Sequence, residues 1–143
     1  MMRSDPSAPD PAPSTRCFLV EDSALIRHNL IAMLEEMLPM QVIGSAEDEA
    51  GAIDWLMHAD KPCDLMIIDI FLKAGTGIGV LKRARQHWPM AKLVVLTNYC
   101  TAEMRRHCVS LGADQVFDKS CELDDLLFYC SNSTPPAHTG CTV

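Results

Sequence analysis

Residues 65–69 read Leu-Met-Ile-Ile-Asp, four consecutive apolar residues followed by a carboxylate. A run so short and so apolar is typical of a strand that is buried on both faces of a parallel sheet. Residues 93–96 (Leu-Val-Val-Leu) and 17–20 (Cys-Phe-Leu-Val) form two further runs of this kind. Together the three runs predict the middle of a buried parallel sheet.

Longer amphipathic segments alternate with these runs along the chain. Ser23 is suited to cap the first helix, whose apolar residues recur near a period of 3.6 until Pro39 closes it. The expected strands are residues 17–20, 41–45, 65–68, 93–96 and 116–117, and the other expected helices are residues 47–59, 76–88, 102–111 and 122–130. Five strands alternating with five helices predict an α/β fold, a doubly wound five-stranded parallel sheet with helices on both faces.

The chain has 143 residues, of which 48% are apolar, and this is enough for one packed domain. We expect that domain at residues 16–130. Residues 1–15 carry four prolines among serine, alanine and aspartate, which predicts a disordered tail. Residues 131–143 are rich in proline, serine and threonine and predict a second flexible tail.

Charge and hydropathy exclude several classes of partner. The net charge of −7 predicts a surface that repels nucleic-acid phosphate, so we expect no nucleic-acid partner. No apolar run approaches the roughly 20 residues of a membrane helix, and the N-terminal segment lacks a signal-peptide core. We therefore expect a cytoplasmic protein with no membrane partner. The scattered cysteines, and methionines such as Met37 and Met57, are expected to fill the core.

Polar side chains stand at the ends of the expected strands, the edge at which parallel sheets hold their working sites. They are Glu21, Asp22, Asp69, Thr97 and Lys119. Three neighbouring carboxylates repel one another unless a cation lies between them, and an all-oxygen set suits Mg²⁺. A hydroxyl and an ammonium nearby suit a phosphoryl group, so the site predicts a carboxylate nucleophile for phosphoryl transfer.

In this order and at these strand ends, the five residues resemble the characteristic set of the receiver domains of bacterial two-component response regulators. The resemblance covers residues 16–130. It implies a flavodoxin-like sheet with strand order 2-1-3-4-5. It also implies that Asp69 accepts a phosphoryl group from a sensor histidine kinase or a histidine phosphotransfer protein.

The same resemblance assigns roles to the other residues. It implies ligands for Mg²⁺ or Mn²⁺ in Glu21, Asp22, Asp69 and the backbone carbonyl of Phe71. Thr97 matches the hydroxyl residue that moves to the phosphate, and Lys119 matches the ammonium that pairs with it. Gly77 matches a recurrent glycine that opens the helix after the third strand.

The chain departs from the usual receiver pattern at three positions. Lys73 and Ser120 stand where the family often has proline, and we expect the Lys119–Ser120 peptide bond to be trans. Val116 stands where many receivers carry a switch aromatic. Its neighbour Phe117 is expected to face the core, because side chains alternate along a strand.

Three bulky side chains flank the expected approach to the phosphate. Phe71 lies two residues after Asp69, Tyr99 lies two residues after Thr97, and Asn98 lies between the last two. None carries a carboxylate that would orient an attacking water. We therefore expect them to slow hydrolysis of a phosphoryl group on Asp69.

These features predict a single-domain response regulator that signals through contacts with a downstream protein, and not an enzyme beyond its own phosphorylation and dephosphorylation. Two alternatives remain open. One is an interaction module whose acidic site is vestigial. The other is a phosphatase with an aspartate nucleophile, which is disfavoured because Phe71 stands where such enzymes have a second aspartate.

Overall fold

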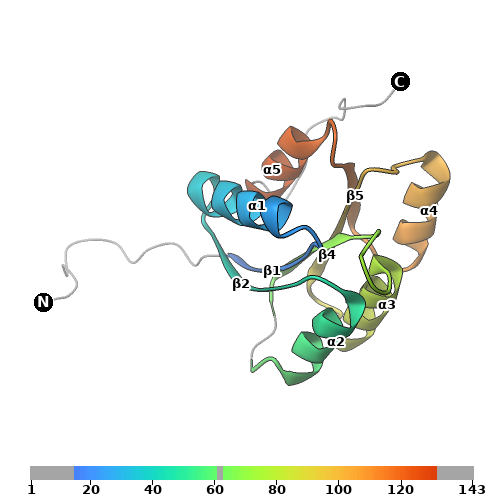
Figure 1. The fold of residues 1–143 in the computed structure, drawn as a ribbon. Helices are drawn as coiled ribbons and strands as arrows, with labels where there is room; N and C mark the ends of the chain where they lie inside the picture. Colours follow the sequence, from blue (N-terminus) through green and yellow to red (C-terminus); the bar gives the residue numbers. More distant parts are fainter. Residues whose placement is uncertain (1–14, 61–62, 132–143) are drawn as a thin grey trace, which may run out of the picture.

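A single sheet of five parallel strands runs through the molecule in the order β2-β1-β3-β4-β5 (Figure 1). The computed structural model describes residues 15–60 and 63–131. The strands are β1 (Thr15–Val20), β2 (Met40–Ala46), β3 (Leu65–Asp69), β4 (Lys92–Thr97) and β5 (Gln115–Asp118). The helices are α1 (Ala24–Met37), α2 (Glu49–His58), α3 (Gly77–His87), α4 (Ala102–Ser110) and α5 (Leu123–Ser131). The predicted fold class and strand order are confirmed.

Every expected strand and helix is present, and the limits differ from expectation by one or two residues. β1 begins at Thr15 and α5 ends at Ser131, each one residue outside the domain expected at residues 16–130. The remainder of the two expected tails, residues 1–14 and 132–143, lies outside the described residues. No helix in the described part of the chain is long and apolar enough to cross a membrane.

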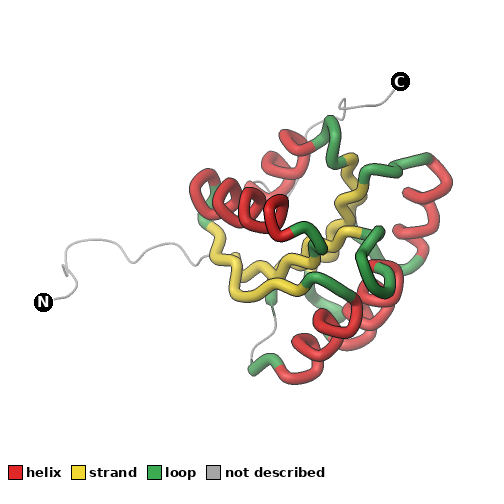
Figure 2. The backbone as a smooth tube through the Cα atoms, in the orientation of Figure 1, coloured by secondary structure: helices red, strands yellow, loops and turns green. Residues whose placement is uncertain are grey.

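Helices cover both faces of the sheet (Figure 2), and an apolar core fills the space between the sheet and the helices on each face. One core lies under α2, α3 and α4, and the other lies under α1 and α5. β3 supplies both, because Met66 and Ile68 point into the first core while Leu65 and Ile67 point into the second. Residues 65–68 lack polar side chains because both faces of this strand are covered.

The helices begin where the sequence places capping side chains. Ser23, Asp48, Thr76 and Thr101 each accept a hydrogen bond from the backbone N–H three residues later. These caps fix where α1, α2, α3 and α4 leave the carboxyl edge of the sheet.

Charged side chains tie down the opposite, amino edge of the sheet. Arg85 on α3 pairs with Asp114 at 2.9 Å, and Asp114 also accepts from the N–H of Leu93. The same guanidinium donates to three backbone carbonyl oxygens, those of Gly112, Pro89 and Ala91. The loop before β5 and the loop before β4 are thereby held together.

Two methionines do not fill the core as predicted. The side chains of Met37 and Met57 are 64% and 50% exposed, respectively. Met57 follows the buried Leu56, so a rotation of about 100° per residue turns it away from the sheet. Met37 lies in the last turn of α1, beyond the buried positions Leu30 and Leu34.

Candidate functional site

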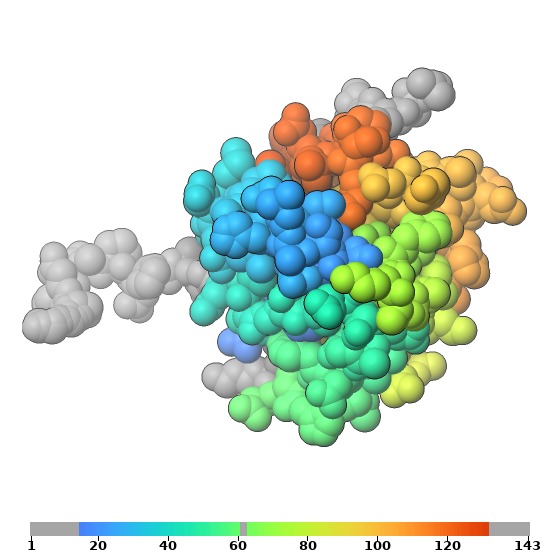
Figure 3. All heavy atoms as spheres, viewed as in Figure 1, coloured from blue at the N-terminus to red at the C-terminus, as the bar shows by residue number. Residues whose placement is uncertain are grey.

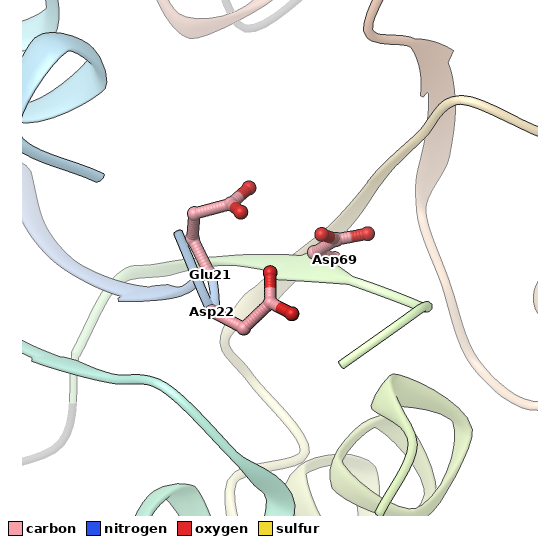
Figure 4. A group of neighbouring side chains, drawn as sticks. All are labelled: Glu21, Asp22 and Asp69. Carbon is pink, nitrogen blue, oxygen red and sulfur yellow. The ribbon is translucent and has the colours of Figure 1, made fainter. Parts of the chain in front are cut away.

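Three carboxylates meet at the carboxyl edge of the sheet. Glu21 and Asp22 follow the end of β1, and Asp69 ends β3, the neighbouring strand (Figure 4). One carboxylate oxygen from each residue lies within 4.8 Å of the others. Glu21 and Asp69 are buried, with exposed fractions of 1% and 5%.

Lys119 supplies the positive charge of the site. It follows β5, and its Nζ donates to Glu21 Oε1 at 2.7 Å and to Asp69 Oδ2 at 3.1 Å. Burial disfavours the ammonium, but the hydrogen bond to Glu21 and the charge of Asp69 outweigh burial and raise the pKa of Lys119. The lysine is therefore held charged between two carboxylates.

Burial also acts on the carboxyl group of Asp69. Removal from water raises its pKa above the usual 3.8, although the nearby ammonium of Lys119 acts in the opposite direction. The neighbouring Glu21 raises the pKa further. One ammonium balances only one of the three carboxylates, so the cluster favours the entry of a cation.

This donor set fits a hard divalent ion. Carboxylate oxygens are the ligands that Mg²⁺ prefers, and Mg²⁺ usually keeps several waters in addition. Glu21, Asp22 and Asp69 each offer one such oxygen, and within the described residues they are the one group of this kind. When bound, the ion would neutralise charge that develops on an incoming phosphate.

Thr97 completes the set of residues at the strand ends. It is fully buried at the end of β4, and its carbonyl accepts from the N–H of Lys119 at 2.9 Å. Its hydroxyl oxygen accepts from the N–H of Tyr99 at 3.2 Å. β4 and β5 are thus tied together where they reach the site.

Two aromatic rings meet at the rim of the site. The ring centroids of Phe71 and Tyr99 lie 4.8 Å apart in an edge-to-face arrangement. Both side chains are exposed, Phe71 by 48% and Tyr99 by 63%, and Asn98 beside them is exposed as well. The N–H of Phe71 donates to Asp69 Oδ1 at 3.2 Å, so its backbone follows the carboxylate directly.

Gly77 is required by the backbone that carries Asp69. A Cβ atom at this position would lie 2.1 Å from the carbonyl oxygen of Asp69 and 2.8 Å from the Cα of Ile70. The N–H of Gly77 donates to the carbonyl of Ile70 at 2.9 Å. The first residue of α3 therefore packs directly against the end of β3.

Two of the three departures from the usual pattern, Val116 and Ser120, lie on β5 or directly after it. Val116 is buried in the core under α4, and Phe117 is buried in the opposite core, as the alternation predicted. No peptide bond in the described part of the chain is cis, so the expected trans bond before Ser120 is confirmed.

Sequence reasoning missed two contacts near the site. Arg105 pairs with the buried Glu122 at 2.6 Å and donates to the carbonyl of Val116 at 2.6 Å. Glu49, in the first turn of α2, accepts from the N–H of Thr76 in the loop that follows Asp69. Both contacts join residues that are distant in sequence. Nothing in the sequence around Arg105 or Glu49 distinguishes these residues from ordinary charged surface residues.

Comparison with known proteins agrees with this geometry. The family model of the response regulator receiver domain matches residues 17–130. Protein-glutamate methylesterase/protein-glutamine glutaminase 1 of Methanospirillum hungatei is 32% identical over 101 residues, which are 69% of this chain and 29% of that protein. Four further curated relatives are also named protein-glutamate methylesterase/protein-glutamine glutaminase. The chain spans less than a third of the length of each of the five.

Solved structures show the same fold at low identity. One is a response regulator from Burkholderia pseudomallei with a phosphorylated aspartic acid, a calcium ion and citrate. It is 18% identical, with a TM-score of 0.72 over 84% of this chain and 68% of that one. Another is the CheX-CheY-BeF3-Mg²⁺ complex from Borrelia burgdorferi, 19% identical, with a TM-score of 0.66 over 73% and 79% of the two chains. The chain belongs to the response regulator receiver domain family of two-component systems.

Proposed function

We propose that Asp69 accepts a phosphoryl group from the phosphohistidine of a sensor histidine kinase or histidine phosphotransfer protein. A carboxylate oxygen of Asp69 attacks phosphorus, the phosphorus–nitrogen bond breaks, and the imidazole nitrogen of the donor keeps the electron pair and takes a proton. The observation that carries the proposal is Lys119 Nζ, which lies within hydrogen-bond distance of both Glu21 and Asp69.

The surrounding residues support this chemistry in distinct ways. In the proposal, Glu21, Asp22, Asp69 and the backbone carbonyl of Phe71 hold Mg²⁺ or Mn²⁺, and the ion offsets the negative charge of the transferring group. Lys119 keeps its charge beside the attacking carboxylate of Asp69, where it can stabilise the transferring phosphoryl group. The hydroxyl of Thr97, whose oxygen accepts from the N–H of Tyr99, donates its own proton to a phosphate oxygen.

We further propose that the phosphorylated domain signals in the cytoplasm by contact with a downstream protein. The net charge of −7 supports a protein partner over nucleic acid, because phosphate repels such a surface. The same site favours phosphate acceptance over ester hydrolysis, since Phe71 offers no carboxyl group to protonate a leaving alcohol.

Intact-mass measurement of the protein incubated with acetyl phosphate tests the proposal. We expect one phosphoryl group on the wild type with Mg²⁺, and none when Mg²⁺ is chelated or in Asp69→Asn. Asp64→Asn is a control that removes a carboxylate at the far edge of the sheet, and it should still be labelled. A wild type that takes no phosphate would identify a vestigial site, and equal labelling of Asp69→Asn would place the acceptor elsewhere.

A further inference from the structure

Three glycines stand at alternate positions after Asp69, Gly75 in the loop and Gly77 and Gly79 in the first turn of α3, and the site explains only Gly77. A Cβ on Gly75 would lie 2.4 Å from the Cβ of Glu49, and a Cβ on Gly79 would lie 2.0 Å from Glu49 Oε2. Gly75 also has a φ of +77°, which side chains rarely adopt. Gly75 and Gly79 therefore make room for one acidic side chain, that of Glu49.

Glu49 reaches this loop from a different helix. α2 begins at Glu49 and packs beside α3, and the loop of residues 70–76 lies against its first turn (Figures 1 and 3). Glu49 Oε1 accepts from the N–H of Thr76 at 2.9 Å, and the N–H of Glu49 donates to the carbonyl of Ala74 at 3.2 Å. One residue thus bonds the loop through both its side chain and its backbone.

The carboxylate also has an electrostatic reason to be there. Thr76 caps α3, and the first turn of that helix contains no acidic residue of its own. A negative charge at a helix N-terminus is stabilised by the backbone N–H groups that point toward it. Glu49 supplies from α2 the charge that α3 lacks.

A short series of contacts links Glu49 to Asp69. Thr76, whose N–H bonds to Glu49, pairs with Phe71 in an isolated antiparallel bridge. The N–H of Phe71 in turn donates to Asp69 Oδ1 at 3.2 Å. A displacement of Thr76 is therefore passed to the backbone of Phe71, which flanks Asp69.

We propose that Glu49 is a positioning residue for the site of phosphate acceptance, an inference that rests on the function proposed above. Glu49 closes the loop of residues 70–76 and so holds the backbone of Phe71, whose N–H donates to Asp69 Oδ1 and whose carbonyl is a metal ligand in the proposed function. The loop carries Lys73 where proline would have restricted it, and the contact with Glu49 restricts it instead. Glu49 lies outside the group of three carboxylates and acts on metal affinity through the loop.

The first test compares Glu49→Ala and Glu49→Gln with Glu47→Gln, a control that removes an exposed acid two residues away. We expect the amide proton of Thr76 to exchange about tenfold faster in Glu49→Ala, because a hydrogen bond to a charged group is lost. The Mg²⁺ concentration for half-maximal labelling by acetyl phosphate should rise about threefold to tenfold, in line with the loss of a part of that bond. Glu49→Gln keeps a hydrogen-bond acceptor, so both of its values should lie between those of the wild type and Glu49→Ala. Both values of Glu47→Gln should match the wild type.

Thermal unfolding separates positioning from a merely structural role. If Glu49→Ala unfolds at a lower temperature but keeps the wild-type Mg²⁺ dependence, the proposal is wrong. Mg²⁺ titration followed by NMR shifts of the Phe71 and Thr76 amides needs no phosphate. A wild type that binds Mg²⁺ but takes no phosphoryl group would therefore refute the proposed function while still testing Glu49.

A double-mutant cycle tests the contact itself. Gly79→Ala places a Cβ against Glu49 Oε2, so it should weaken Mg²⁺ binding in the wild type. In the Glu49→Ala background the obstacle is gone, and adding Gly79→Ala should change Mg²⁺ binding no further. Equal effects of Gly79→Ala in the two backgrounds would show that Glu49 is not what requires the glycine.

Discussion

Replacement of Gly77 by alanine is expected to damage both stability and the site, because of one close approach. The added Cβ would stand 2.1 Å from the carbonyl oxygen of Asp69, whereas ordinary contacts begin at 3.4 Å. The backbone of β3 or the first turn of α3 must therefore move by about 1 Å, and overpacking of this kind costs about 1–3 kcal/mol. Alanine's higher helix propensity returns only about 1 kcal/mol of this.

Urea unfolding followed by tryptophan fluorescence measures the change, since Trp55 and Trp88 lie against the core beside α3. Once the gain in helix propensity is subtracted, we expect Gly77→Ala to lower the free energy of unfolding by about 1–2 kcal/mol and to reduce phosphate labelling of Asp69. Gly51→Ala is a matched control in the first turn of α2, because its Cβ would meet only side-chain atoms, at 3.0 Å and beyond. Wild-type stability in Gly77→Ala would refute the argument from close packing.

Three further outcomes follow from the side chains around the sheet. If the ring pair of Phe71 and Tyr99 shields the phosphoryl group, Phe71→Asn and Tyr99→Glu will each lose phosphate faster than the wild type, and unchanged decay of labelled protein will contradict the shield. Arg85→Lys keeps the positive charge but loses the planar guanidinium that donates to three backbone carbonyls. Urea unfolding should therefore show a free energy of unfolding lower by about 1–3 kcal/mol, and an unchanged value would show that those hydrogen bonds are dispensable. The hydroxyl and N–H of Ser120 hold the pKa of Asp118 below 3.8, so Ser120→Ala should raise that pKa toward 3.8 in an NMR titration of the carboxyl carbon, and an unshifted titration would remove the hydroxyl as the cause.

Much of the fold was predictable because burial on two faces leaves a simple mark in a sequence. The apolar runs at residues 65–68 and 93–96 lie at the centre of the sheet, and each is followed directly by a polar residue of the site. Once the strands are parallel, the carboxyl ends must share one edge, and this brings Glu21, Asp69 and Lys119 together. Helix periodicity was less informative. It indicates which face of a helix points toward the sheet but not how far the sheet extends beneath that helix, and Met37 is exposed because it lies beyond the buried part of α1.

The contacts that escaped prediction join charged residues distant in sequence. Glu49 bonds Thr76, 27 residues away, and Arg105 bonds Glu122, 17 residues away. No local pattern distinguishes either acid from a solvated one. The alternate glycines were the available signal for Glu49, because glycine inside a helical segment such as residue 79 indicates a close neighbour.

The charged residues at the two edges of the sheet have different roles. At the amino edge, the charged side chains of Arg85, Asp114 and Asp64 form hydrogen bonds with the backbone of loops and strand ends. At the carboxyl edge, Lys119 pairs with Glu21 and Asp69. Sequence change can therefore act separately on the lifetime of the folded protein and on its response to a signal. A more heat-resistant form of this chain is best sought by redesigning the edge around Arg85, where substitutions leave the chemistry at Asp69 untouched.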